Sequence, residues 1–153
     1  MKRKRLKKSD IRKLNEKINS LYGIDVPAKN DTVEEVSDEY QLIFVNGKPL
    51  FFYHGEKMLP TLKLLLDQDI LRHVVVDMGA VRFVTNGADI MRPGIVQVDP
   101  DILEGEAVSV LDEKNRKPLG IGIALFSGKE MQDMESGKVL SNIHHIGDPL
   151  WNL

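Results

Sequence analysis

The sequence predicts an α+β protein in two parts: a helix and a hairpin in residues 1–72, then a small sandwich or barrel of short strands in residues 73–153. Hydrophobic residues make up 42% and charged residues 29% of the 153 residues, which is typical of a soluble globular chain. No apolar run approaches the roughly 20 residues of a membrane span. Near residue 72 the pattern changes from helical periodicity to short apolar segments separated by glycines, which favours many short strands.

The N-terminal segment is strongly basic. Residues 1–20 carry nine Lys or Arg and two acids, a balance of +7, whereas residues 21–153 carry twelve basic and twenty-one acidic residues, a balance of −9. This asymmetry indicates a basic arm that binds a polyanion, although a solvating charge run or an approach to an anionic membrane are alternatives. The stretch Lys2–Lys8 has no hydrophobic periodicity, so we expect it to be mobile in the free protein. The arm comprises Lys2, Arg3, Lys4, Arg5, Lys7, Lys8, Arg12 and Lys13.

An amphipathic helix is expected over residues 9–22. Ser9 is the expected N-cap, and Gly23 is the expected C-cap because glycine tolerates the left-handed conformation. Apolar residues recur in this segment at helical spacing, at Ile11, Leu14, Ile18 and Leu21.

A loop is expected over residues 24–38, followed by a β-hairpin of Gln41–Val45 and Lys48–Tyr53. Asn46-Gly47 lies between the two runs, and both residue types tolerate the positive φ of a type I′ turn. Next, Leu59-Pro60-Thr61 is expected to begin a short helix through Leu66, with Pro60 near its first position.

The second part is expected to contain strands separated by glycines and polar turns. Asp112–Lys117 is the clearest of these turns. The predicted strands are Val74–Val76, Val108–Leu111, Leu119–Leu125 and Val139–Ile143.

The sequence contains none of the usual signatures of catalysis, metal binding or cofactor binding. It has no cysteine, which excludes disulfides and thiolate sites and suggests a reducing cytoplasm. His144-His145 is the best metal pair, but adjacent residues of a strand point to opposite faces. The cluster of Asp99, Asp101, Glu104 and Glu106 lacks the spacing of a calcium loop and is more typical of a solvated turn. We therefore expect neither an enzyme nor a cofactor.

The second part resembles a PUA domain, a small mixed β pseudo-barrel that binds structured RNA. The resemblance rests on a series of short motifs: Val74-Val75-Val76-Asp77-Met78-Gly79-Ala80, Phe83-Val84, Gly87-Ala88, Ile90-Met91, Pro93-Gly94-Ile95, Gly120-Ile121-Gly122 and His144-His145-Ile146-Gly147-Asp148-Pro149-Leu150-Trp151. It covers residues 73–153, the expected PUA domain, and leaves residues 1–72 as the basic arm and an α/β pre-PUA domain.

The first part resembles the pre-PUA region of the malignant-T-cell-amplified protein family, through Val45-Asn46-Gly47-Lys48-Pro49-Leu50-Phe51-Phe52 and Pro60-Thr61-Leu62-Lys63-Leu64-Leu65. The resemblance implies a cytoplasmic translation factor, associated with the small ribosomal subunit and active in initiation, reinitiation or recycling with tRNA. It also implies a SUI-domain protein as a partner. The short chain indicates an archaeal member.

The resemblance further implies where RNA lies: along the turn after the first strand, the short helix that follows and a late strand. It assigns RNA contact to Asp77, Met78, Gly79, Ala80, Arg82, Phe83, Arg92, Pro93, Gly94, Lys138, His144 and His145.

The charge of the second part complicates this assignment. Residues 73–153 hold seven basic and twelve acidic residues, a net charge of −5, whereas counterion release favours a basic RNA-binding surface. We therefore expect a localised basic strip of Arg82, Arg92 and Lys138. The alternative function is an adaptor that recruits a protein or targets tRNA to an RNA-modifying enzyme.

Overall fold

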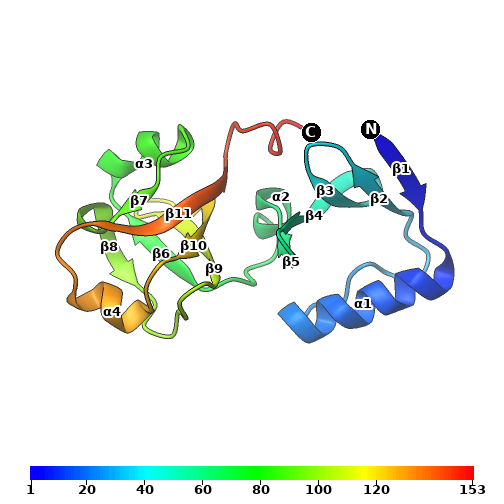
Figure 1. Ribbon diagram of the computed structural model, residues 1–153, viewed down its shortest axis with the longest axis horizontal. Coiled ribbons are helices and arrows are strands. Elements are labelled where there is room, and N and C mark those ends of the chain that lie inside the picture. Colours follow the sequence, from blue (N-terminus) through cyan, green and yellow to red (C-terminus); the bar gives the residue numbers. More distant parts are fainter. The chain divides into compact units, whose positions relative to one another are not determined.

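The computed structural model describes residues 1–153, which divide into two compact units, Met1–Ile70 and Leu71–Leu153 (Figure 1). Each unit has its own sheet and its own hydrophobic core. The expected α+β class is confirmed, since both units combine helices with a sheet. None of the helices has the length and apolar composition needed to cross a bilayer.

The first unit is an antiparallel sheet in the order β1-β2-β3-β4-β5, with α1 packed on it. Its elements are β1 (Lys2–Arg5), α1 (Lys8–Tyr22), β2 (Val33–Ser37), β3 (Gln41–Val45), β4 (Lys48–His54), β5 (Lys57–Pro60) and α2 (Leu62–Leu65). The apolar stripe of α1 enters the core through Ile11, Leu14 and Ile18. The predicted hairpin is confirmed, with Asn46 and Gly47 at φ 51° and 82° between β3 and β4.

Several local predictions in this unit are corrected. Lys7, not Ser9, occupies the N-cap of α1, and Leu21 is exposed. Strands β2 and β5 occupy segments expected to be loop and helix entry. Pro60 ends β5, and the side chain of Thr61 caps α2 by accepting a hydrogen bond from the amide of Leu64.

The expectation of a mobile arm is wrong for residues 2–5, which form the edge strand β1. They pair in antiparallel register with β2, where Lys4 and Arg5 face Glu35 and Glu34. The ion pair of the strand is that of Arg3 with Glu34, at 3.5 Å, and no apolar alternation marks the strand. Directly after β1, the buried Leu6 donates its amide to the carbonyl of Val33 at 2.9 Å. The basic residues are therefore held on the sheet.

The second unit is a curled mixed sheet in the order β7-β11-β10-β9-β6-β8. Its elements are β6 (His73–Val76), α3 (Met78–Thr85), β7 (Ile90–Met91), the 3-10 turn η1 (Arg92–Gly94), β8 (Ile95–Val98), β9 (Ala107–Asp112), β10 (Pro118–Ala124), α4 (Gly128–Asp133) and β11 (Lys138–His145). Only β6 and β9 pair in parallel. The four predicted strands are confirmed as β6, β9, β10 and β11, and the expected pseudo-barrel corresponds to this curled sheet. Helix α3 packs on β10 and β11, and α4 packs on β8 (Figure 1).

One glycine of the second unit is required by close packing. A Cβ atom on Gly128 would lie 2.1 Å from the carbonyl oxygen of Asp99, so only glycine fits at the start of α4. The adjoining capping box, in which Ser127 and Glu130 exchange hydrogen bonds, fixes the helix in that position.

Candidate nucleic-acid interface

The chain turns from β6 into α3 through Asp77. Its carboxylate accepts a hydrogen bond from the amide of Ala80 at 2.9 Å, the usual role of an N-cap aspartate. The amide of Asp77 donates to the carbonyl of Gly94 at 2.9 Å, which holds η1 beside the start of α3. Gly94 fits there because a Cβ on it would already lie 3.2 Å from the Cβ of Ala80. Asp77 and Gly94 therefore hold the start of α3 and the turn η1 next to each other.

A groove of about 480 Å³ runs between α3 and the segment of β7 and η1. Most of its lining is apolar, and Phe83 and Met91 are 52% and 50% exposed. Such exposed apolar faces can stack on or pack against unpaired bases. The structure brings together at this groove several residues assigned to RNA contact, namely Asp77, Gly79, Ala80, Phe83, Pro93 and Gly94.

The predicted basic strip is only partly present. The guanidinium of Arg82 lies over the Phe83 ring, 5.0 Å from its centroid, and makes no ion pair. Arg92 instead donates from Nε to the carbonyl of Met131 at 2.6 Å and from Nη1 to that of Ile95 at 3.0 Å. These bonds hold η1 in place, and the assignment of Arg92 to RNA contact stays a prediction.

Lys138 of β11 is exposed but paired with an acid that lines the groove. Its Nζ lies 3.0 Å from Oδ2 of Asp89, and the amide of Asn142 donates to the other oxygen at 2.9 Å. The hydrogen bond from Asn142, followed by that from Lys138, lowers the pKa of the Asp89 carboxyl. The negative charge of Asp89 in the groove therefore lies beside the ammonium group of Lys138.

The histidine pair ends β11, and its two rings have different environments. His144 is 1% exposed, with Nδ1 2.8 Å from Oδ2 of Asp148, so its assignment to RNA contact is corrected. Burial alone would raise the pKa of Asp148, but hydrogen bonds from His144 and from the amides of His145 and Trp151 lower it. His145 is half-buried, and its Nε2 would lie 3.0 Å from a Cβ on Gly87. No three acidic or histidine side chains gather to hold a metal ion.

A second cationic surface lies on the first unit. All four residues of β1 are exposed, and α1 continues the surface with Lys8, Arg12 and Lys13. Arg3 differs from the other residues of β1, since its guanidinium forms an ion pair with Glu34 at 3.5 Å and lies over the Phe44 ring. The other side chains of β1 make no ion pair, so they can attract a polyanion.

Sequence reasoning missed part of the groove lining. Val76, Val84, Ala88, Asp89, Ile90 and Met91 also line it. Ile90-Met91 belongs to the motifs that carry the family resemblance, but an isoleucine and a methionine are common core residues and give no sign of a contact site. Ile90 and Met91 line the groove with Phe83 because β7 pairs with β11.

Two family models together match almost the whole chain. The PUA domain model matches residues 72–146, and the domain of unknown function DUF1947 matches residues 2–68. The first match lies within the second unit and the second match within the first unit.

Three relatives match along most of their length. An uncharacterized protein of Methanocaldococcus jannaschii is 40% identical, over 96% of this chain and 93% of its own. Translation machinery-associated protein 20 of Saccharomyces cerevisiae is 32% identical, over 95% of this chain and 84% of its own. Malignant T-cell-amplified sequence 1-A of Xenopus laevis is 32% identical, over 91% of this chain and 83% of its own.

Solved structures share the fold. A hypothetical protein of Pyrococcus horikoshii superposes with a TM-score of 0.82 at 36% identity, covering 99% of this chain and 98% of that one. A chain from an H/ACA ribonucleoprotein bound to a substrate RNA matches with a TM-score of 0.51 at 25% identity, covering 63% of this chain and 29% of that one.

Proposed function

The chain belongs to the family of PUA-domain proteins that includes malignant T-cell-amplified sequence 1 and translation machinery-associated protein 20, and from this premise we propose that it is a noncatalytic, cytoplasmic RNA-binding translation factor. Its RNA is small-subunit rRNA or tRNA, and it acts in initiation, reinitiation or recycling. Residues 1–72 serve as the basic and pre-PUA part, and residues 73–153 as the PUA domain.

The observation that carries the proposal is the groove between α3 and η1. It has two exposed apolar faces, Phe83 and Met91, and the guanidinium of Arg82, which makes no ion pair, lies over the Phe83 ring at its border. This composition suits a few unpaired nucleotides, whose bases pack on apolar side chains while one phosphate meets the arginine. A long duplex would need many more phosphate contacts than this groove offers.

The basic surface of the first unit supplies the long-range attraction that the acidic second unit lacks. Lys2, Arg3, Lys4, Arg5, Lys7, Lys8, Arg12 and Lys13 form this surface. In the proposed complex they contact phosphates of the same RNA, and binding therefore weakens as salt rises.

Sedimentation with small ribosomal subunits from a matched source tests the proposal. We expect the protein to migrate with the subunits at low salt and to remain bound at moderate salt. Protein that stays at the top of the gradient at both salt concentrations contradicts ribosome association.

An adaptor that brings tRNA or a partner protein to an RNA-modifying enzyme is the second candidate. It is favoured by the net charge of −5 on residues 73–153 and by the likeness to a chain of the H/ACA ribonucleoprotein. A protein that binds free tRNA but not subunits, or that binds a partner protein tightly and RNA only weakly, would favour this adaptor function.

A further inference from the structure

The outer edge of β1 has no partner strand. β1 is the first strand in the order of its sheet and pairs only with β2, and Figure 1 shows it at the end of the sheet. All four of its residues are exposed. Such an edge presents unpaired backbone N–H and C=O groups, which can bind a further strand.

The residues whose backbone faces outward follow from one hydrogen bond. The amide of Leu6 donates to the carbonyl of Val33 at 2.9 Å, which makes these two residues a hydrogen-bonded pair of the antiparallel ladder. Bonded and non-bonded pairs alternate along such a ladder, so every second residue before Leu6 also bonds to β2. The N–H and C=O groups of Arg3 and Arg5, the residues in between, therefore point away from β2.

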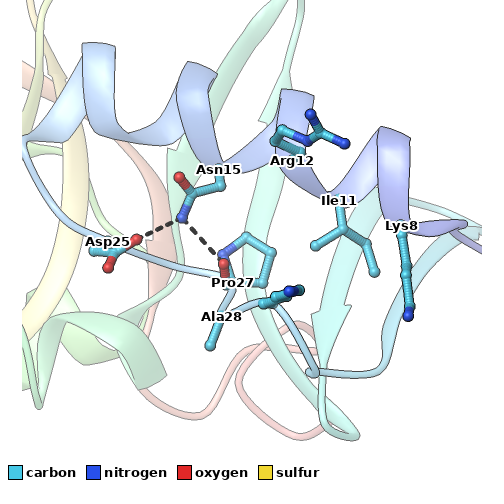
Figure 2. Close-up of a pocket in the computed structure, with 8 residues that line it drawn as sticks. Lys8, Ile11, Arg12, Asn15, Asp25, Pro27 and Ala28 are labelled. Atoms are coloured by element: carbon cyan, nitrogen blue, oxygen red, sulfur yellow. Dashed lines mark hydrogen bonds between the residues drawn. The ribbon is translucent and has the colours of Figure 1, made fainter.

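The strand is held in place by its connection to α1. Leu6 is buried in the core of the unit together with Ile11 of α1. Helix α1 is in turn tied to the loop after it, where Nδ2 of Asn15 donates to Oδ1 of Asp25 at 2.7 Å and to the carbonyl of Pro27 at 3.0 Å (Figure 2). An added strand therefore meets a formed edge, and little conformational entropy is lost on this side of a complex.

The charges of β1 decide which kind of strand can add. Lys2, Lys4 and Arg5 make no ion pair, so their charges are available to a partner. A second copy of this chain would bring basic residues against basic residues, which is unfavourable in facing positions. An acidic strand instead places carboxylates opposite the cations and gains backbone hydrogen bonds as well.

The spacing of the two lysines fits an extended peptide. Because the backbone of Arg3 and Arg5 would bond to an added antiparallel strand, Lys2 and Lys4 would form the non-hydrogen-bonded pairs, in which facing side chains lie closest. Alternate residues of any extended strand repeat at about 6.6 Å, so acids at alternate positions can face both lysines.

A hollow of about 430 Å³ beside β1 leaves room for the side chains of such a peptide. It is lined by Lys2, Arg3, Lys4, Glu35 and Ser37. Three of these five residues are cationic and one is anionic, so the hollow favours a carboxylate over an ammonium group.

We propose that the free edge of β1 binds an acidic peptide segment of a partner protein by strand addition. The peptide lies antiparallel to β1, as every neighbouring strand of this sheet does, and bonds to the backbone of Arg3 and Arg5. Its acidic side chains face Lys2 and Lys4. This site goes beyond the proposed function, in which RNA contacts the side chains of β1 and not its backbone.

The test measures the binding of blocked, labelled hexapeptides to the full chain by fluorescence anisotropy. A peptide of alternating glutamate and threonine should bind, with its glutamates opposite the two lysines and its threonines opposite the two arginines. A peptide of alternating lysine and threonine should not bind. Absence of binding by the acidic peptide, or equal binding of the two peptides, overturns the proposal.

Methylation of the peptide backbone separates strand addition from simple charge attraction. N-methylation of the threonines removes the N–H groups that face β1 and should weaken binding about tenfold, the effect of losing two or more hydrogen bonds. N-methylation of the glutamates adds the same groups on the outward edge and should change the affinity less than about twofold. Equal affinity of the two methylated peptides overturns the proposal.

A pair of variants tests the edge from the protein side. Arg5→Pro removes one outward N–H, and proline is tolerated in an edge strand where the N–H faces solvent. Arg5→Thr removes the same charge and keeps the N–H. The acidic peptide should bind about fivefold more weakly to Arg5→Pro than to Arg5→Thr, and equal affinities contradict the proposal. Thermal midpoints show whether both variants fold, and the methylated peptides decide on the wild-type chain if Arg5→Pro does not.

Labelled tRNA distinguishes this proposal from the proposed function. The two variants of Arg5 should bind tRNA alike, because the proposed RNA contacts are made by side chains. A chain that binds tRNA but not the acidic peptide counts against strand addition alone and leaves β1 to RNA. A chain that binds the peptide but neither tRNA nor ribosomal subunits counts against the proposed function alone.

Discussion

The Nζ of Lys138 lies 3.0 Å from Oδ2 of Asp89, so the lysine that borders the groove is held by a carboxylate of the groove itself. A phosphate that approaches Lys138 must compete with this carboxylate and is repelled by it. In the proposed complex with RNA, the pair therefore limits affinity at this edge of the groove.

Asp89→Asn should increase the affinity for RNA about fivefold, because it releases Lys138 and removes a negative charge, while the new amide oxygen still accepts from Asn142. Fluorescence anisotropy with a labelled tRNA measures the change. Asp101→Asn is the matched control, since it removes an exposed charge outside the groove. An equal gain in the two variants would show that only the net charge matters.

Phe83→Ala should weaken RNA binding about tenfold, because one stacked base is worth roughly 1–3 kcal/mol. The ring is 52% exposed, so the thermal midpoint should change little. Leu103→Ala provides the control, because Leu103 is 64% exposed and lies outside the groove. If the two variants bind alike, RNA does not use this groove.

Replacing Lys2 and Lys4 together by Thr should lower the salt dependence of RNA binding while preserving β1, because threonine suits a strand. The slope of log K against log salt should fall by about 0.7 for each phosphate of single-stranded RNA that the variant no longer neutralises. Binding isotherms at several salt concentrations measure this slope. The control pair is Lys48→Thr with Lys114→Thr, two exposed lysines of the hairpin and of a turn. An unchanged slope would exclude β1 from the interface.

Asp148 should make the stability of the protein depend on pH in acid. Hydrogen bonds from His144 and two amides lower its pKa in the folded state, so its contribution is complete above the unfolded pKa of about 3.9 and is lost as pH falls through the folded pKa. At pH 7 Asp148→Asn should reduce the free energy of unfolding by about 2 kcal/mol.

Urea denaturation at a series of pH values measures this effect. The difference between wild type and Asp148→Asn should begin to shrink near pH 4, where the unfolded carboxyl gains a proton, and should continue to shrink as pH falls through the lowered pKa of the folded carboxyl. A difference that is constant down to pH 2 would mean that the charge of Asp148 contributes nothing. Asp101→Asn, whose carboxylate is exposed, should match wild type throughout.

The elements that sequence reasoning found are those with a local signal. Helix α1 has apolar residues at helical spacing, and the β3–β4 hairpin has Asn46-Gly47 at its turn. Strand β1 has no such signal, because it forms by pairing with β2, whose residues lie about thirty positions away in the sequence. The same holds for β5, whose strand character comes from pairing with β4.

The candidate site was predicted from motif positions, which do not report burial or partners. His144 and Arg92 were assigned from their motifs, yet the His144 ring is buried against Asp148 and the Arg92 guanidinium donates to two carbonyls. Met91 shows the opposite case: its exposure beside the groove depends on the short pairing of β7 with β11.

The ordered backbone of β1 also affects how its basic residues bind a polyanion. A flexible basic tail loses conformational entropy when it binds, whereas the backbone of residues 2–5 has already lost it on folding of the sheet. Lys2 and Lys4 lie on the same face of the strand, about 6.6 Å apart along its axis. This spacing is fixed by the extended backbone before any polyanion binds. A polyanion therefore meets the two lysines of β1 as a pair whose backbone positions are already set.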